Sequence, residues 1–481
     1  MSEAERSTRP DGWVFLLFLL LLVWAPLPLA SNRAWAWSLL EIGIFALSAL
    51  WLLLFAIGKA RFSGVFRSAW WAVSLFAAWL GALAFQVLPL PMSWLVQVSP
   101  VSARLAELVM GSGISAATIS VDAEASRAFA LKSLAYFLAF CLTLLLVNRR
   151  DRLRMLAFVL VGSGVVQAIY ASFMHLAGFD FRLFYATYSH RSYTVGTFVN
   201  RNHLAGYLEM TLAIGIGAMI GTLRSGGGVR NWRQRFRDWL AWAVSPRIIL
   251  RLMLVVMVIA LVMTRSRMGN TAFFVSMLVA GMIGLALSRH ATRSTVILLV
   301  SLVVIDIFIV GAWFGVEKVV TRIGQTPLLR TDKGGEQSVE ERVEPGLNSL
   351  AILREYPLFG SGGGTFYTAF SKHRPGEIVA FYDFTHNDYF QFLSEVGVIG
   401  AGILGLLAAS TLFVALKAQY QRSDPLSRGV AFGVTMAIIA LAIHSSVDFN
   451  LQIPANALTF TVLLAMGWVA HAVERADTHS R

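Results

Sequence analysis

Runs of about 20 apolar residues recur along the whole chain, and they constrain the fold more than any other feature. A helix of that length crosses the roughly 30 Å of hydrocarbon in a bilayer. Hydrophobic residues make up 57% of the 481 residues and charged residues only 14%, which excludes an ordinary soluble protein. The sequence therefore predicts an all-α, polytopic membrane protein.

The apolar runs predict about 12 transmembrane helices. The expected spans are 13–29, 35–57, 69–88, 128–147, 155–177, 201–223, 247–264, 270–288, 294–314, 393–417, 428–447 and 455–473. We interpret the first as an uncleaved helix, because acidic residues accompany Arg6 and Arg9 before it, unlike in a signal peptide.

Arginine and lysine gather in alternate loops, and this bias predicts the orientation. It places both termini in the cytoplasm and the long loop before the tenth span outside. The expected organisation is nine helices in 1–314, a large periplasmic loop with short helices in 315–392, and three helices with a cytoplasmic tail in 393–481. The formal charge of +13 is explained by the loop arginines, so the lipid bilayer, and not nucleic acid, is the expected partner.

Cysteine and histidine usage argues against several kinds of site. The single cysteine, Cys141, lies in an apolar run, which leaves no disulfide and no thiolate cluster. The nine histidines are scattered singly, without metal-ligand spacing. Residues 360–364 are rich in glycine but lack the Lys-Ser/Thr pair of a nucleotide-binding loop. Neither a metal nor another cofactor is expected.

Residues 381–400 pass from a polar segment into a hydrophobic one. His386 stands at this boundary, close to Asn387 and Gln391. Polar groups at the mouth of a spanning helix indicate a functional site. The alternative is a plain polar helix start, with Thr385 or Asn387 capping the first turn.

Two arginines occupy a very short outer turn between two spans, where the bias predicts few positive charges. Arg265 and Arg267 have no acidic neighbour in this turn. A guanidinium presents a planar fork of donors that fits phosphate oxygens, so the pair predicts a site for a lipid phosphate or diphosphate. The alternative is that both side chains extend toward lipid headgroups.

A second outer cluster contains Arg201 and Asn202 at the start of the sixth span, where free amides favour an anion. Deeper in the spans, Glu209 and Asp306 are candidates for buried partners of arginines. Glu395 follows His386 by nine residues, about 900° and 13 Å along a regular helix, so it is expected to act structurally on another face.

Four motifs are spaced along the second half of the chain. They are Asn202-His-Leu-Ala205, Thr264-Arg-Ser-Arg-Met-Gly269, Arg342 with Pro357-Leu-Phe-Gly-Ser-Gly362, and His386-Asn-Asp-Tyr-Phe-Gln391 with Glu395-Val-Gly-Val-Ile-Gly400. Together they resemble the O-antigen ligase and polymerase superfamily, bacterial inner-membrane glycosyltransferases of GT-C-like helical architecture. The sequence departs from the family pattern at Gly346, because an aromatic residue commonly follows the arginine that Arg342 matches.

The resemblance implies an undecaprenyl-diphosphate-linked glycan as donor and a sugar hydroxyl at the periplasmic membrane surface as acceptor. His386 matches the histidine that activates the hydroxyl, and Arg267 and Arg342 match arginines that hold the diphosphate. A histidine with an ordinary pKa of about 6.5 accepts a proton at neutral pH. Fixed guanidiniums stabilise the leaving diphosphate, and attack from the opposite face inverts the anomeric centre.

Three functions are compatible with this pattern. A ligase transfers finished polysaccharide to lipid A–core, whereas a polymerase uses another lipid-linked repeat unit as acceptor. A non-enzymatic transporter is disfavoured, because the polar clusters lie on one side of the membrane and not near its midplane. We favour the ligase, with Asn202, Arg201, Asn387, Gln391 and Glu395 supporting the site.

Overall fold

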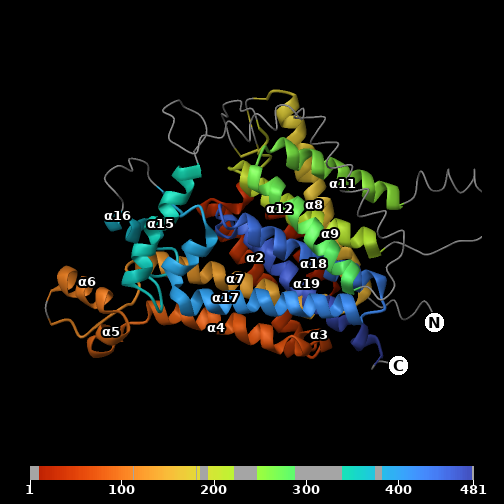
Figure 1. Ribbon diagram of the computed structural model, residues 1–481. Helices are drawn as coiled ribbons and strands as arrows, with labels where there is room; N and C mark the ends of the chain where they lie inside the picture. Colours follow the sequence, from red (N-terminus) through yellow and green to blue (C-terminus); the bar gives the residue numbers. More distant parts are fainter. Residues whose placement is uncertain are drawn as a thin grey trace, which may run out of the picture.

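The computed structural model describes residues 10–111, 113–179, 181, 183–184, 193–221, 246–287, 339–373 and 382–478. Helices dominate these residues and run roughly alongside one another in a single bundle (Figure 1). The all-α, polytopic membrane fold predicted from the sequence is confirmed.

Nine of the described helices are long and apolar enough to cross a membrane. They are α2 (Ala34–Ala56), α4 (Trp70–Val87), α7 (Ala123–Leu146), α8 (Arg150–Leu176), α9 (Arg201–Gly221), α12 (Arg267–Leu287), α17 (Asp388–Gln421), α18 (Pro425–His444) and α19 (Pro454–Thr478). Two shorter apolar helices, α1 (Gly12–Trp24) and α11 (Pro246–Met263), accompany them. Eleven of the twelve expected spans coincide with these helices, and the expected span 294–314 lies outside the described residues.

The first helix is shorter than predicted. It ends at Trp24 and not at residue 29, because Pro26 and Pro28 interrupt the helical hydrogen bonding. The chain then turns through the 3₁₀ helix η2 (Leu29–Ser31), whose residues have positive φ. The 13 residues of α1 extend about 20 Å, less than the thickness of the hydrocarbon layer.

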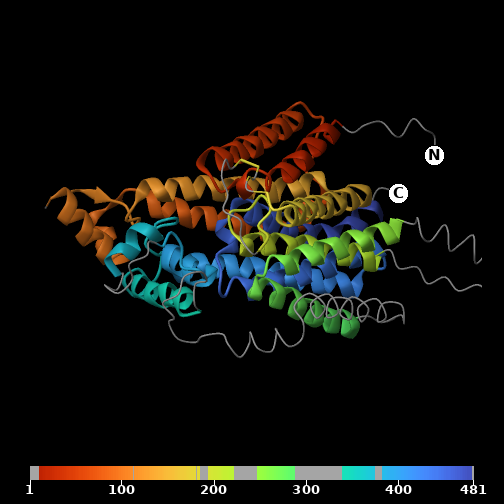
Figure 2. The same ribbon diagram turned by 90° about the horizontal axis from the view of Figure 1, so that it is seen from above.

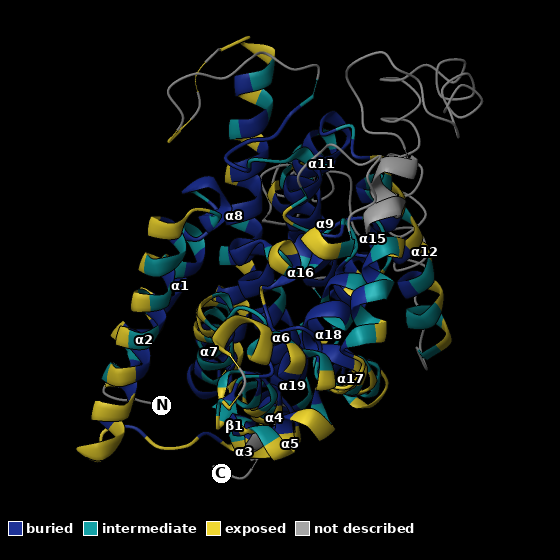
Figure 3. Cartoon of the chain, turned by 90° about the vertical axis from the view of Figure 1, so that its left-hand side faces the viewer, coloured by how far each residue is buried: buried dark blue, intermediate teal, exposed yellow. Residues whose placement is uncertain are grey.

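The core of the bundle is the close crossing of α9 with α18. A Cβ atom at Gly217 would lie 2.2 Å from the carbonyl oxygen of Gly429, and one at Gly433 would lie 2.7 Å from that of Ala213. Such close backbone approach requires glycine and is typical of helix pairs in membranes. The α1–α2 hairpin lies at one edge of the bundle and α12 at the opposite edge (Figure 2). The outer faces of α1 and α2 are exposed (Figure 3).

Shorter elements gather mainly at one end of the bundle. They are the two-stranded antiparallel sheet of β1 (Leu90–Pro91) and β2 (Ala116–Ala117), and the helices α5 (Met92–Val98), α6 (Pro100–Met110), α15 (Val339–Glu355) and α16 (Phe366–His373). Helix α15 ends at Glu355, because the residue before Pro357 is disfavoured in a helix. The short helix α3 (Gly64–Ser68) joins α2 to α4.

Helix α17 begins earlier than the predicted residue 393 and contains a break. Gly397 has φ 65°, so the amide and carbonyl groups around it lose their helical partners. The loop Pro357–Gly362 supplies new ones: Pro357 O accepts from Val398 N at 3.0 Å, and Gly362 N donates to Glu395 O at 2.9 Å. An irregular backbone is tolerated at this point because the loop satisfies its polar groups.

Candidate functional site

His386 adopts a backbone conformation that is uncommon for a residue with a side chain. Its φ is 56°, in the left-handed region, and its side chain is half-buried. The next residue, Asn387, is the N-cap of α17, and its Oδ1 accepts from Phe390 N at 3.1 Å. Such strained residues persist where the surrounding structure fixes them, often at functional sites. Asn387, one of the two caps named in the alternative interpretation, therefore caps the helix directly after the unusual backbone of His386.

Aromatic rings hold the His386 imidazole. The ring of Phe449 lies 4.9 Å from it at 72°, and the ring of Tyr382 lies 5.9 Å away at 88°. Phe449 also stacks on Phe384 at 4.7 Å and meets the His203 imidazole at 4.7 Å. Phe449 is thus shared by two histidines from distant parts of the chain, and it fixes the plane of His386.

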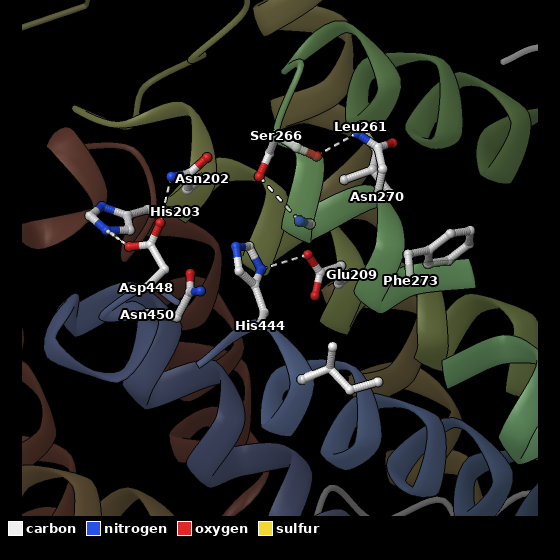
Figure 4. A network of polar contacts seen from close by, with 12 residues as sticks. Asn202, His203, Glu209, Leu261, Ser266, Asn270, Phe273, His444, Asp448 and Asn450 are labelled. Carbon is white, nitrogen blue, oxygen red and sulfur yellow. Dashed lines mark hydrogen bonds and ion pairs between the residues drawn. The ribbon is translucent and has the colours of Figure 1, made fainter. Parts of the chain in front are cut away.

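Asp448, the residue before Phe449, is buried and ties this segment to α9 (Figure 4). Asn202 Nδ2 donates to Asp448 Oδ2, and His203 Nε2 lies 3.3 Å from Asp448 Oδ1. Burial alone raises the pKa of Asp448. The neighbouring His203 and His444 imidazoles and the Phe449 N–H outweigh this effect and hold the pKa below its usual range.

Asp388 connects the first turn of α17 to the same segment. Its N–H donates to Ser445 O at 2.9 Å and to Asp448 O at 3.2 Å. Its buried carboxylate accepts from Ser445 Oγ at 2.7 Å and from Leu451 N at 3.1 Å, next to the 3₁₀ helix η3 (Asn450–Gln452). The turn between α18 and α19 is therefore bonded directly to the helix that follows His386.

Gln391 and Glu395 link the His386 segment to the glycine-rich loop. Gln391 Oε1 accepts from Thr385 N at 2.8 Å, and Gln391 Nε2 donates to Glu395 Oε1 at 2.7 Å. The same Glu395 oxygen accepts from Phe366 N at 3.1 Å, where α16 begins. The Glu395 side chain thus joins α17 to the first residue of α16.

The arginine turn between α11 and α12 packs on the first half of α9. Arg265 has φ 54° and a half-buried side chain, whereas Arg267 begins α12 and is exposed. A Cβ atom at Gly269 would lie 2.6 Å from Ala205 Cβ and 3.0 Å from Glu209 Oε1. Helix α9 also carries His203, whose ring contacts Phe449, and Phe449 in turn contacts His386. The arginine turn therefore lies at the same end of the bundle as His386.

Arg342 lies in α15, and its side chain is outside the described part of the structure. One turn later, Gly346 allows a close approach: a Cβ atom there would lie 2.9 Å from Phe390 Cδ2. The glycine that departs from the family pattern therefore brings α15 against α17, four residues after His386. Arg201, at the start of α9, places its guanidinium over the Tyr193 ring at 4.3 Å.

The expectation that Glu209 pairs with an arginine is wrong. Glu209 Oε1 lies 2.8 Å from His444 Nδ1, and both side chains are fully buried (Figure 4). Asp306 lies outside the described residues. Sequence reasoning also missed Asp448 and Phe449, although polar residues in the short turn between two spans were a signal.

Residues 252–405 match a family model described as O-antigen ligase. The matched segment covers about a third of the chain. The match supports the O-antigen ligase and polymerase superfamily and a glycosyltransferase of that type. No curated protein sequence matches the chain. The matched segment includes Arg265, Arg267, Arg342 and His386, whereas Asn202, Asp448 and Phe449 lie outside it.

Proposed function

We propose that this protein is a glycosyltransferase of the O-antigen ligase kind. It moves an undecaprenyl-diphosphate-linked glycan to a sugar hydroxyl of lipid A–core at the periplasmic face of the bacterial inner membrane. The observation that carries the proposal is the match over residues 252–405, which includes the strained His386 and the arginine turn.

In the proposed reaction, His386 is the general base. The acceptor oxygen forms a bond to the anomeric carbon of the donor while its proton passes to the imidazole. The bond between that carbon and the diphosphate oxygen breaks, and undecaprenyl diphosphate leaves. Attack from the face opposite the leaving group inverts the anomeric configuration. The edge-to-face contact with Phe449 supports this role, since it orients the ring.

Arg265, Arg267 and Arg342 stabilise the departing diphosphate in this proposal. Its negative charge grows in the transition state, and fixed guanidiniums favour that state over the ground state. The left-handed backbone of Arg265 supports a fixed geometry of the turn. With the charge stabilised by arginines, the proposed reaction is independent of metal ions.

The orientation in the membrane follows from the charge bias of the loops. Both termini are cytoplasmic, and His386 faces the periplasm. The single-sided arrangement of the His386 segment, the arginine turn and α15 favours catalysis at a membrane surface over a transport path.

A deletion strain tests the ligase proposal against a polymerase. Loss of a ligase leaves long glycan chains on the carrier lipid and none on the outer lipid. Loss of a polymerase leaves single repeat units on the outer lipid, and this outcome would replace the proposed acceptor. Complementation with the wild type and with His386→Gln in parallel shows whether the phenotype depends on the proposed base.

A further inference from the structure

The bundle contains a cavity of about 810 Å³ that begins beside the His386 segment. Asp383, Phe384 and Asp388 line one end of it. Its wall then follows α17 as far as Ala408, twenty residues after Asp388 and roughly 30 Å along a helix. Helices α4, α7, α18 and α19 complete the wall with mainly apolar side chains. The shape suits a hydrocarbon chain whose polar head lies at the proposed site of transfer.

Two glycines stand on the α17 side of the cavity. Gly402 and Gly405 line it, and both are exposed on α17. A Cβ atom at either glycine would meet no atom within 4 Å. The missing side chains leave a gap on this side of the cavity, with room for a lipid chain.

A cation faces this apolar space. Among the described residues that line the cavity, Lys132 of α7 is the only lysine or arginine. Its Nζ lies 4.4 Å from the centroid of the Trp37 ring. Glu41 and Glu395 attract it electrostatically, but in the described part of the chain neither forms an ion pair with it. An ammonium beside hydrocarbon is costly unless an anionic group reaches it, and such residues mark functional sites in membranes.

The cavity is separate from the arginine turn. None of its described lining residues belongs to α9, α11 or α12. The proposed reaction needs two membrane-anchored substrates at one histidine, and the arginines are assigned to the diphosphate of the donor. We infer that this cavity holds the acceptor: a phosphate-bearing glycolipid with an acyl chain along Gly402 and Gly405 and a phosphate on Lys132. The inference rests on the proposed function.

Direct binding tests the inference without requiring transfer. The purified full-length protein is titrated with lipid A, and separately with undecaprenyl diphosphate as the donor probe, and bound lipid is measured by native mass spectrometry. Gly405→Leu fills the gap, and Lys132→Met removes the charge. Each should weaken lipid A binding about tenfold, because a hydrogen bond to a charged group or a buried chain contributes at least that much. Binding of undecaprenyl diphosphate should not change.

Matched variants separate these effects from general damage. Gly81→Leu makes the same change on α4 at a glycine that is equally open and does not line the cavity, so it should bind both probes normally. Lys132→Arg keeps the charge and should retain most lipid A binding. Unchanged lipid A binding in Gly405→Leu and Lys132→Met, or no binding by the wild type, overturns the inference. If the two variants lose binding of undecaprenyl diphosphate alone, or lose binding of both probes equally, the inference is also overturned, because the cavity then serves the donor.

Transfer assays distinguish this inference from the proposed function. With lipid A–core as acceptor, Lys132→Met should raise KM for the acceptor and leave KM for the donor unchanged. An inactive wild type with intact lipid A binding would contradict the proposed reaction and leave the cavity assignment standing.

Discussion

The imidazole of His386 and the ring of Phe449 meet edge to face, with centroids 4.9 Å apart and planes at 72°. The two residues are 63 positions apart in the sequence. Phe449 follows Asp448, which is bonded to Asn202 and lies beside His203. The geometry of the proposed base therefore depends on residues outside the segment 252–405 that matches the family model.

Replacement of His386 should abolish transfer without unfolding the protein. His386→Gln keeps hydrogen-bonding atoms but cannot take a proton, so we expect turnover to fall about 10²–10⁴-fold. The measurement is transfer by purified protein, with donor binding measured separately. His373→Gln is the control, because His373 pairs with Glu355 on α15 and has no proposed catalytic role. Normal turnover by His386→Gln would reduce His386 to a positioning residue, and Asp383 would be tested next.

The arginine turn should discriminate between guanidinium and ammonium. Arg267→Ala should lower turnover about 10²–10³-fold, the effect of removing one transition-state donor. Arg267→Lys should restore only part of it, because a point charge does not reproduce the bidentate fork. Arg342→Ala should resemble Arg267→Ala, and Arg104→Ala on the exposed face of α6 should be neutral. Full activity of Arg267→Lys would indicate general charge attraction.

Asp448 should make the stability of the folded protein depend on pH. Its pKa is depressed in the folded state, so folding favours the ionised form. The stabilisation is fully present above the pKa of an aspartate in the unfolded chain, about 3.9. It is lost as the pH falls toward the pKa of Asp448 in the folded protein. Thermal unfolding in detergent should therefore show wild type losing more stability than Asp448→Asn on acidification below about pH 4. Equal losses of stability with falling pH in the two proteins would show that protonation of Asp448 is not linked to unfolding.

The α9–α18 crossing should not tolerate a methyl group. Gly217→Ala forces Cβ against Gly429 O, and we expect a loss of at least about 1–3 kcal/mol in unfolding free energy. The measurement is the unfolding midpoint in detergent. Gly162→Ala on α8 meets no atom within 4 Å and should be neutral or slightly stabilising. Equal midpoints for the two variants would mean that the helices can separate at little cost.

Topology can be tested with two exposed serines on opposite sides of the proposed membrane. Ser371 lies on α16, and Ser423 lies between α17 and α18. In a Cys141→Ser background, an impermeant thiol reagent applied to the periplasmic side should label Ser371→Cys and not Ser423→Cys. Permeabilised cells provide the control for Ser423→Cys. The reverse pattern would place His386 in the cytoplasm and contradict the proposed function.

Periodicity and length predicted the fold well because crossing a bilayer demands long apolar helices. The alternative interpretation of the segment around His386 also named Asn387, with Thr385, as a cap, and Asn387 is the N-cap of α17. Sequence reasoning failed where a partner is distant in the chain. Nothing local indicates that Glu209 pairs with His444 or that Phe449 contacts His386. The break at Gly397 was also missed, because its cause is the loop that packs against it and not the helix itself.

The break in α17 has a consequence for the order in which the protein is made. The loop Pro357–Gly362, which satisfies the broken backbone, is synthesised before α17, so the bend can form as soon as α17 is inserted. The helix start is different, since Asp388 N donates to carbonyls in the turn between α18 and α19. A nascent chain halted after α17 should already hold the bent helix and its loop, yet its His386 would lack Phe449. Only the arrival of the final hairpin would complete the site, so a half-inserted enzyme would be inactive.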